Sequence, residues 1–576
     1  MFCGRRAIRN PRQGMYLRVG PAIDSLGFPG HIVFMRTSDS SACLFPSPKR
    51  CMKQGGLIFL LAMCLPSWAT TYYVLPGGTG TKAGSSWSNA RCSIPDPLAA
   101  GDTVYIGNVV GQDMANTAVT ACAEPTHSFS GSGTSASHIT IKAATGADHG
   151  SATGWSSSMG VDVNTKITWS NTWVPSNGLK AGFWTFCGNY YDFDGKVGTA
   201  DSTGTYGFYM KSAGNLFGFI KLDSHDCGET SLTGYTFQNI ELDGVEANGT
   251  VGGTQSGASA VYAGSPVSTT ATVTNLSVTH AYMHDIMDFL ASAGDVSGVT
   301  YGNLWLYTNF SDAAQHSNAI DCNSSGFTGN ATCLSNLTVY STVFKNIQGT
   351  GVIMCLTGQC NNWQIYNNVI YYSSDWDTIC EHGDSTATCG MSKGMGDNAG
   401  NGTCDASGTA GCVTNSVFYG NTWANIHLKP GHPGADSAGI QMGQTASGGN
   451  VAQNNLWWNC TIGPIWTNNK ITHDYNRWLN TGITTTVLAA HEFQTGTAPG
   501  GGATDPFVNS FSNFQLSSES VDTHLNDGVL LPPPYNVDFA GTTRGGDGTW
   551  ERGAFEFNSG VTQNPLPPTN LVVSVQ

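Results

Sequence analysis

Apolar and polar residues alternate along several stretches of the chain, each of which begins near an asparagine. Side chains at every second position of a β-strand share a face, so this pattern predicts short strands with one buried side. The spacing excludes a helical repeat, in which apolar residues recur every third or fourth position. The clearest pairs are Leu276 and Val278, Leu304 and Leu306, and Leu337 and Val339.

The asparagines mark a degenerate repeat of the form Asn-x-x-apolar. Successive copies are separated by 36, 28, 33, 26, 53 and 35 residues, and the interval of 53 fits two units or one unit with an insertion. A unit this short cannot bury its own apolar face, so neighbouring units must stack and share a core. The sequence therefore predicts an all-β solenoid. The copies begin at Asn239, Asn275, Asn303, Asn336, Asn362, Asn415 and Asn450.

Segments near both ends of the predicted solenoid carry a family resemblance. TYYVLPGGTGTKAGSSW begins at Thr71, PLAAGDTVYIG ends at Gly107, and DFAGTTRGGDGTWERGAFEF ends at Phe557. They resemble the N-terminal cap and the closing segment of pectate-lyase-like, right-handed parallel β-helix proteins. The resemblance implies one domain over residues 70–557, built of stacked three-strand rungs. Proteins of this family include polysaccharide lyases, glycoside hydrolases, epimerases and non-catalytic surface proteins, so the resemblance leaves the activity open.

Residues 52–69 are predicted to be a signal peptide. A lysine precedes an apolar run, and a small-x-small cleavage signal ends at Ala69. A buried core helix is the alternative, because the run is shorter than the ~20 residues of a membrane span; a lipoprotein box at Cys64 fits poorly. Residues 1–51 are interpreted as a disordered extension from an over-extended start, or less well as a transit segment. Residues 558–576 form a proline-rich tail.

The charge balance restricts the partners. Without residues 1–69 the chain holds 15 basic and 37 acidic residues, a net charge of −22, which excludes nucleic acid as an expected partner. An acidic polysaccharide would need a divalent cation between it and the protein, and Ca²⁺ prefers the oxygen ligands that this chain has in plenty. Neutral glycans remain open. We therefore expect a polysaccharide partner, with Ca²⁺ as the candidate cofactor.

Thirteen cysteines follow residue 69, and several form close pairs around glycine-rich loops. Zinc knuckles have two-residue spacing, which these pairs lack, so disulfide bonds are favoured over a metal site. Disulfides indicate an oxidising compartment, in agreement with a secreted or cell-surface protein. The odd count leaves one thiol over, and Cys460 has no near neighbour. The expected pairs are Cys322 with Cys333, Cys355 with Cys360, Cys380 with Cys389, and Cys404 with Cys412.

One register position places chemically active side chains on successive rungs. The ninth residue after each asparagine is His284, Asp312, Lys345 or Tyr371 in four consecutive copies. Stacked rungs lie ~4.8 Å apart, so these side chains would form a ladder. Insertions could shift the register, in which case the same residues would be ordinary solvated surface. Position ten adds Asp285 and Asn346, and position thirteen adds Asp288 and His316.

The ladder suggests two reactions. A polysaccharide lyase needs a base and a cation that neutralises the uronate carboxylate; here Lys345 could be the base, with His284 or His316 as partner. In the same site Asp285, Asp288 and Asp312 would orient a side chain or bind Ca²⁺. A hydrolase needs two carboxyls, for which Asp288 and Asp312 are the candidates. The shortage of arginines argues against the lyase, but elimination remains the favoured reaction.

Three further groups of residues stand out; the first two have two readings each, and the third has one. A second acidic cluster is either a cation site or an acidic loop, and the later tryptophans either stack on sugars or fill the interior. A set of amides near one turn is interpreted as a structural hydrogen-bonded ladder. These groups are Asp375, Asp377, Glu381, His382 and Asp384; Trp363, Trp376, Trp423, Trp457, Trp458 and Trp466; and His280, Asn309, Asn368 and Asn421.

The sequence as a whole predicts a secreted β-helix protein that binds and cleaves a polysaccharide, by a lyase reaction in preference to hydrolysis. The alternative is a non-enzymatic cell-surface, adhesive or glycan-binding protein, for which low charge and disulfide-stapled loops fit equally well.

Overall fold

A computed structural model describes most of the chain between residues 69 and 557, within a compact unit that comprises Ser67–Gln576. Its gaps are residues 116–121, 124–125, 162–165, 172–181, 196–205, 213–217, 245–258, 266–271, 308–317, 324–331, 348, 380–389, 398–410, 432–438, 443–446, 462, 464–469 and 484–487. The predicted extension, nearly all of the predicted signal peptide and the predicted tail therefore lie outside the described residues.

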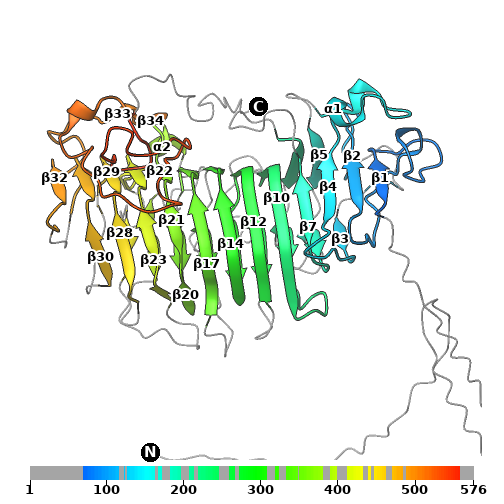
Figure 1. Ribbon diagram of the computed structural model, residues 1–576, viewed down its shortest axis with the longest axis horizontal. Coiled ribbons are helices and arrows are strands. Elements are labelled where there is room, and N and C mark those ends of the chain that lie inside the picture. Colours follow the sequence, from blue (N-terminus) through cyan, green and yellow to red (C-terminus); the bar gives the residue numbers. More distant parts are fainter. Residues whose placement is uncertain are drawn as a thin grey trace, which may run out of the picture. The chain divides into compact units, whose positions relative to one another are not determined.

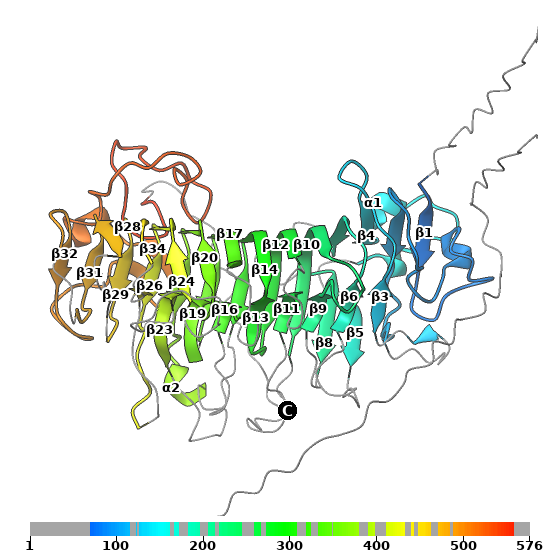
Figure 2. The same ribbon diagram turned by 90° about the horizontal axis from the view of Figure 1, so that it is seen from below.

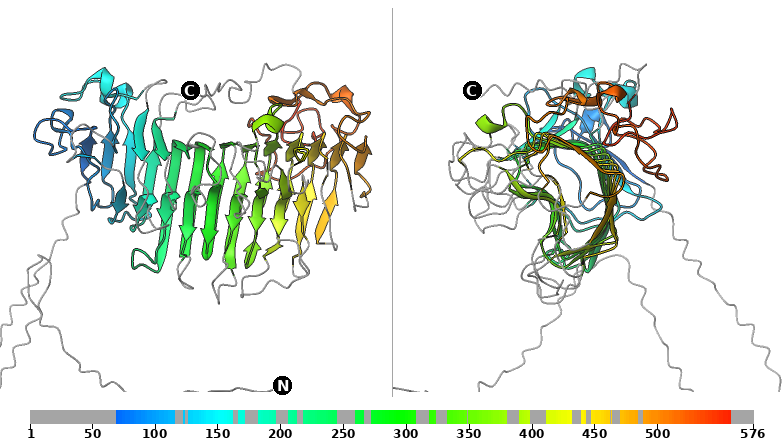
Figure 3. Two further views of the ribbon diagram at one scale, coloured as in Figure 1. Left: turned by 180° about the vertical axis from the view of Figure 1, so that it is seen from behind. Right: turned by 90° about the vertical axis from the view of Figure 1, so that its left-hand side faces the viewer.

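Strands stack in parallel along one axis and form three faces of a coil (Figures 1 and 3). In the described part of the chain, every strand-to-strand pairing in the two large sheets is parallel. Each strand pairs with its equivalents one rung before and one rung after. The predicted right-handed parallel β-helix is therefore the fold, and its rungs are as short as the repeat intervals suggested.

The first face begins at the N-terminal end of the coil and runs through most rungs. Its strands are β1 (Thr71–Val74), β2 (Thr103–Ile106), β4 (Ile139–Ala143), β7 (Tyr191–Asp194), the first parts of β10 (Ser231–Asp243) and β12 (Thr272–His284), β14 (Asp295–Gly302), β17 (Thr332–Tyr340), β20 (Gln359–Asn361), β21 (Gln364–Tyr366), β24 (Cys412–Thr414), β25 (Val417–Tyr419), β28 (Asn450–Gln453) and β30 (Ile471–Asp474).

The second face belongs to the same large sheet, which bends sharply between the two faces. Its strands are β5 (Ile167–Asn171), β8 (Phe208–Ser212), the last residues of β10 and β12, β15 (Trp305–Tyr307), β18 (Val343–Lys345), β22 (Val369–Tyr371), β26 (Thr422–Ala424), β29 (Leu456–Trp458), β31 (Arg477–Leu479) and β32 (Phe493–Thr495).

The third face is a separate sheet (Figure 2). Its strands are β3 (His127–Phe129), β6 (Gly182–Phe186), β9 (Gly218–Leu222), β11 (Ser259–Gly264), β13 (Asp288–Ala293), β16 (Asn318–Cys322), β19 (Gly349–Cys355), β23 (Met391–Asp397) and β27 (Ile440–Gln441). Helices are few and short in the described residues: α1 (Gly146–His149), α2 (Trp376–Ile379) and three single-turn 3-10 segments, Trp87–Asn89, Ser157–Met159 and Glu519–Val521. None of these helices is long and apolar enough to cross a membrane.

Residues with positive φ, in the left-handed region, recur at fixed places in each rung. Their positions show that the asparagines of the predicted repeat belong to different rows. Asparagine tolerates positive φ better than most residues, and here it recurs in three rows. One row lies within the first face and contains Asn275, Asn336, Asn362 and Asn415, at φ between 52° and 57°. The second lies at the bend between the first two faces and contains Asn239, His280, Asn303, Ser341, Asn367, Gly420, Asn454 and Tyr475. The third follows the second face and contains Asp285, Asn346, Asn425, Asn459 and Asn480.

A column of buried amides follows the bend. The side-chain amide of Asn368 donates to Asn421 (2.9 Å), Asn421 donates to Asn455 (3.0 Å), and Asn455 donates to Asn476 (2.9 Å). All four side chains are buried, so each bond satisfies a polar group that would otherwise be costly to bury. The predicted amide ladder therefore includes Asn368 and Asn421. His280 lies at the bend instead, and Asn309 lies outside the described residues.

The interior is a stack of apolar side chains that alternate with the outward-facing ones. Inward positions of the second face are Trp169, Met210, Leu242, Met283, Leu306, Phe344, Ile370, Trp423, Trp457 and Trp478, all fully buried. The tryptophans of the later rungs thus mainly fill the core: Trp363, Trp376, Trp423 and Trp457 are buried, and Trp466 lies outside the described residues. Trp458 points outward and packs with apolar side chains of residues 503–557.

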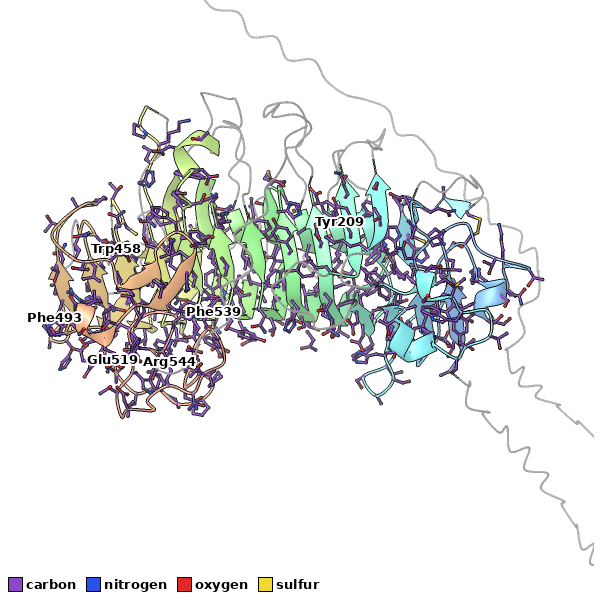
Figure 4. The ribbon with its side chains drawn as sticks, turned by 90° about the horizontal axis from the view of Figure 1, so that it is seen from above. Tyr209, Trp458, Phe493, Glu519, Phe539 and Arg544 are labelled. Atoms are coloured by element: carbon purple, nitrogen blue, oxygen red, sulfur yellow. A yellow bond between two sulfur atoms is a disulfide. The ribbon has the colours of Figure 1, made fainter. Side chains whose placement is uncertain are left out.

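Residues 503–557, which we call the C-terminal cap, pack on the second face of the later rungs (Figures 1 and 4). Phe514 contacts Tyr371, with ring centroids 4.7 Å apart. Arg544 donates to Oδ1 of Asn367 at 3.0 Å. The cap also contains the antiparallel pair β33 (Phe507–Asn509) and β34 (Asn513–Leu516). It therefore covers this face from Tyr371 to Leu479.

Candidate functional site

Ionisable side chains gather on the outer surface of the second face, on rungs that precede the cap. Tyr209 comes from β8, Glu241 and Asp243 from β10, and His284 from β12; Lys166 directly precedes β5. Strand alternation explains the grouping, because Glu241 pairs with Tyr209 in register and Asp243 pairs with His284. Figure 4 shows Tyr209 on these rungs. We call these five residues, together with Asp285, the second-face cluster.

His284 is the centre of the cluster. Its Nδ1 lies 2.8 Å from Asp285 Oδ2 and 3.7 Å from Asp243 Oδ1, and its Nε2 lies 3.5 Å from Glu241 Oε1. Burial alone would lower the pKa of His284, but its pairing with Asp285 and Glu241 outweighs burial and raises the pKa to about 10. His284 is therefore an imidazolium at neutral pH, surrounded by carboxylates.

Glu241 and Tyr209 of the cluster also have shifted pKa values. Lys166 pairs with Glu241, and although burial would raise the pKa of Glu241, its pairing with His284 and Lys166 lowers it below the usual value. Tyr209 donates its hydroxyl hydrogen to Asp243 Oδ2 at 2.5 Å. Burial, together with the charge of Asp243, raises the pKa of Tyr209 and keeps the hydroxyl neutral. The cluster thus holds an ionised carboxylate beside two proton donors.

Lys345 lies on the same outer row, two rungs beyond His284. The observed row is His284, Tyr307, Lys345 and Tyr371. Tyr307 therefore takes the place that the sequence predicted for Asp312, because Asn303 belongs to the bend row and the count from it starts five residues too late. Asp312 and His316 lie outside the described residues. Burial lowers the pKa of Lys345, and the charge of Asp375 opposes the effect.

Asp288 does not join this row. It begins β13 on the third face, where it is buried and accepts a hydrogen bond from the backbone of Asn318 at 3.0 Å. Asn318 also donates to Asp321 Oδ2 at 3.1 Å. Burial raises the pKa of both carboxyls, that of Asp321 to about 7, and the charge of Asp321 raises that of Asp288 further. Asp288, which the sequence predicted beside His316 in the same site as His284 and Lys345, therefore lies on a different face from His284 and Lys345.

The predicted calcium ligands are also separated, since Asp285 faces His284 while Asp288 faces Asp321. One carboxylate oxygen from each of Asp243 and Asp285 lies within 4.8 Å of a His284 ring nitrogen. Such a trio can hold a metal ion in principle, but Ca²⁺ prefers oxygen ligands. Here the imidazolium already supplies the positive charge between the two carboxylates, so the trio fits Ca²⁺ poorly.

The described part of the second acidic cluster is a set of local contacts. Ser373 donates to Asp375 at 2.5 Å, and Asp377 lies 3.1 Å from Nε2 of His427. Glu381, His382 and Asp384 lie outside the described residues.

Disulfide bonds fasten the coil at several rungs. The structure joins Cys322 to Cys333 and Cys355 to Cys360, as the spacing predicted. It also joins Cys92 to Cys122 and Cys187 to Cys227, which are too far apart in sequence for the spacing to show. Cys412 is disulfide-bonded too, while Cys380, Cys389 and Cys404 lie outside the described residues. Within the described residues, the buried Cys460 is the free cysteine.

Four members of the second-face cluster were missed from the sequence: Lys166, Tyr209, Glu241 and Asp243. The first two precede the first recognised repeat. The last two follow Asn239 by two and four residues. A register that counted from the bend row would have aligned Asp243 with His284 and Lys345, with Glu241 two residues before Asp243.

The strand pairings decide the fold: parallel rungs, three faces and left-handed residues at the bends. The chain has a pectate-lyase-like parallel β-helix fold. No family model matches its sequence, and no curated protein matches it. Among solved structures it is similar to pectate lyase Pel9A, with 13% identity over 85% of this chain and 96% of that one and a TM-score of 0.38.

Two further β-helix structures are similar at the same low level. A rhamnogalacturonan lyase shares 12% identity over 71% of this chain and 87% of its own, with a TM-score of 0.34. The PL6 family alginate lyase AlyGC shares 10% identity over 69% and 51%, with a TM-score of 0.29. These similarities concern the fold alone.

Proposed function

We propose that this protein binds a polysaccharide on the outer surface of the second face and cleaves it, by elimination in preference to hydrolysis. The observation that carries the proposal is the second-face cluster, in which a cation, a neutral hydroxyl and ionised carboxylates converge from consecutive rungs. Grouped acids and bases of this kind are typical of sites that move protons.

Elimination needs a cation that neutralises the uronate carboxylate, a base that removes the proton on the adjacent carbon, and an acid that protonates the leaving oxygen. In this proposal the imidazolium of His284 supplies the charge and the neutral hydroxyl of Tyr209 supplies the acid. Lys345 is the base, because burial lowers its pKa toward the working range. Rungs are spaced ~4.8 Å apart, so the backbones of Lys345 and His284 lie ~10 Å apart along the row. The proposal requires their side chains to converge on one uronate, because the base removes the proton on the carbon next to the carboxylate that His284 neutralises.

Hydrolysis has weaker support in this site. It needs a carboxylic acid that stays protonated at neutral pH, beside a second carboxylate. The pKa of Glu241 is lowered, so Glu241 is ionised instead. Asp288 and Asp321, whose pKa values are raised, lie on the third face and not in this site.

We also propose that the protein acts outside the cell. Its four described disulfide bonds would persist in an oxidising compartment and not in a reducing one. This agrees with the signal peptide predicted at residues 52–69.

The test uses Lys345→Met and His284→Gln, with acidic and neutral polysaccharides, in the presence and absence of Ca²⁺. Unsaturated products absorb in the ultraviolet, whereas hydrolysis gives reducing ends alone. The proposal predicts absorbance growth that both variants lose. The matched control is Lys142→Met, a half-buried lysine on the first face that contacts Tyr105. Full activity in Lys345→Met would overturn the site assignment.

A non-enzymatic glycan-binding or adhesive protein is the second candidate. It is favoured by the balance of the cluster, in which Lys166 pairs with Glu241 and His284 pairs with Asp285. Mutually paired charges often serve structure alone. Glycan binding without turnover across the panel would select this function.

A further inference from the structure

Three carboxylates from separate parts of the C-terminal cap converge at one point. Glu519 belongs to the 3-10 turn Glu519–Val521, and Asp547 and Glu551 belong to the closing segment. One carboxylate oxygen of each lies within 4.8 Å of the other two. Figure 4 shows Glu519 and Arg544 within this cap.

Glu551 is the buried member of the group. Only 1% of it is exposed, and its Oε2 has no hydrogen-bond partner in the described part of the chain. The guanidinium of Arg544 does not satisfy it, since Nη1 of Arg544 donates to the backbone oxygen of Glu551 and lies 3.5 Å from Glu556. A buried carboxylate without a donor is costly. Burial, followed by the neighbouring Glu556, raises the pKa of Glu551 to about 9.

A second acceptor oxygen beside the group is also unsatisfied. The side-chain amide of Asn526 donates to Asp547 Oδ2 at 2.8 Å, but Oδ1 of Asn526 is buried and has no hydrogen-bond partner among the described residues. Thr549 donates to the same carboxylate from its backbone at 3.0 Å, and these bonds hold Asp547 in place. Two buried oxygens at the group, Oε2 of Glu551 and Oδ1 of Asn526, thus lack a donor among the described residues.

We propose that Glu519, Asp547 and Glu551 bind a Ca²⁺ ion that fastens the C-terminal cap, with the amide oxygen of Asn526 as a further ligand. Ca²⁺ takes six to eight oxygen ligands in flexible geometry, and a mixture of carboxylates, an amide oxygen and water matches that preference. Mg²⁺ demands a stricter octahedron and keeps its waters. Asp547 is exposed, which leaves one side open for water ligands.

The ion would link segments that lie 32 residues apart in sequence, from Glu519 to Glu551. Binding to the folded cap alone stabilises the fold by mass action. Sites of this open kind in extracellular modules bind with dissociation constants of about 0.1–1 mM.

The test uses the purified chain and the variant Glu551→Gln. Because the resting form of Glu551 is the neutral acid, glutamine keeps its shape and lets the cap fold. We expect terbium luminescence, excited through tryptophan, to report the site, since the buried Trp550 is the chain neighbour of Glu551. Wild-type protein should also gain several degrees of Tm in 5 mM Ca²⁺ at pH 8, on the order of a tenfold excess over the dissociation constant.

Glu551→Gln and Glu519→Gln should each weaken Tb³⁺ and Ca²⁺ binding at least tenfold. Asp148→Asn, which changes an exposed carboxylate of α1, should leave binding unchanged. Asp285→Asn is the control for ion binding at the second-face cluster. It should weaken binding there and leave Tb³⁺ and Ca²⁺ binding at the cap site unchanged. Equal Tb³⁺ luminescence and equal Tm gain in Glu551→Gln and wild type would overturn the proposal, and so would the absence of any Ca²⁺ effect at pH 8.

Discussion

The side-chain amide of Asn421 donates to Oδ1 of Asn455 at 3.0 Å and links two rungs of the coil through their interior. Both side chains are buried, and the same geometry recurs on either side of them. The column couples consecutive rungs through side chains as well as through strand hydrogen bonds.

Asn421→Ala should lower the free energy of unfolding by about 3 kcal/mol, because it leaves buried donors and acceptors of Asn368, Asn455 and Ile365 without partners. Urea denaturation measures this loss. The control is Asn336→Gly, an exposed left-handed position that glycine tolerates, which should cost less than ~1 kcal/mol. Equal losses in the two variants would contradict a structural role for the column.

His284 makes stability depend on pH. Its folded-state pKa of about 10 exceeds the usual 6.5, so its pairing with Asp285 and Glu241 contributes fully below pH 6.5 and is lost as pH rises toward 10. Thermal unfolding between pH 6 and pH 10 should show wild type losing more stability than His284→Gln. If both lose the same amount, then His284 is not the cation of the cluster.

The buried pair on the third face gives a separate transition at lower pH. The folded-state pKa of Asp321 is about 7, above its usual 3.8, so the stability that its proton contributes is present in acid and is lost as pH rises through 7. Asp321→Asn should remove this dependence and make the protein more stable than wild type at pH 8. The measurement is Tm at pH 5 and pH 8, and a less stable variant at pH 8 would show that the ionised pair has a partner that asparagine cannot replace.

Under the proposed function, the titration of the Lys345 amine sets the pH dependence of kcat. Only the free amine can accept a proton, so kcat should rise with pH through a pKa below 10.5. Asp375→Asn should move this transition to lower pH, because Asp375 raises the pKa of Lys345. Steady-state kinetics on a cleaved substrate measures both profiles, and an unmoved profile would assign the base elsewhere.

The sequence was most informative where backbone geometry dominates. Alternation identified strands, and the asparagines identified bends, since positive φ is a property of single residues. It could not show that the left-handed residues form separate rows, because Asn275 and Asn303 are the same residue type in different rows. For this reason the sequence predicted Asp312 at the ladder position where the structure has Tyr307.

The candidate site was only partly predictable for the same reason. His284, Asp285 and Lys345 lie in recognised repeats, while Lys166 and Tyr209 come from rungs with no repeat asparagine. The face on which Asp288 lies depends on where the second face ends and the third begins, within three residues of Asp285. Such a turn is fixed by tertiary packing, which periodicity does not encode.

In the described part of the coil, strand pairs join each rung to its two neighbours, and the amide column adds side-chain bonds between the rungs from Asn368 to Asn476. A pulling force along the axis would therefore load one interface at a time, and the coil would lengthen in steps of a single rung. In a force-extension experiment the cap, which contacts several rungs at once, would be the element that must release before the later rungs can peel away.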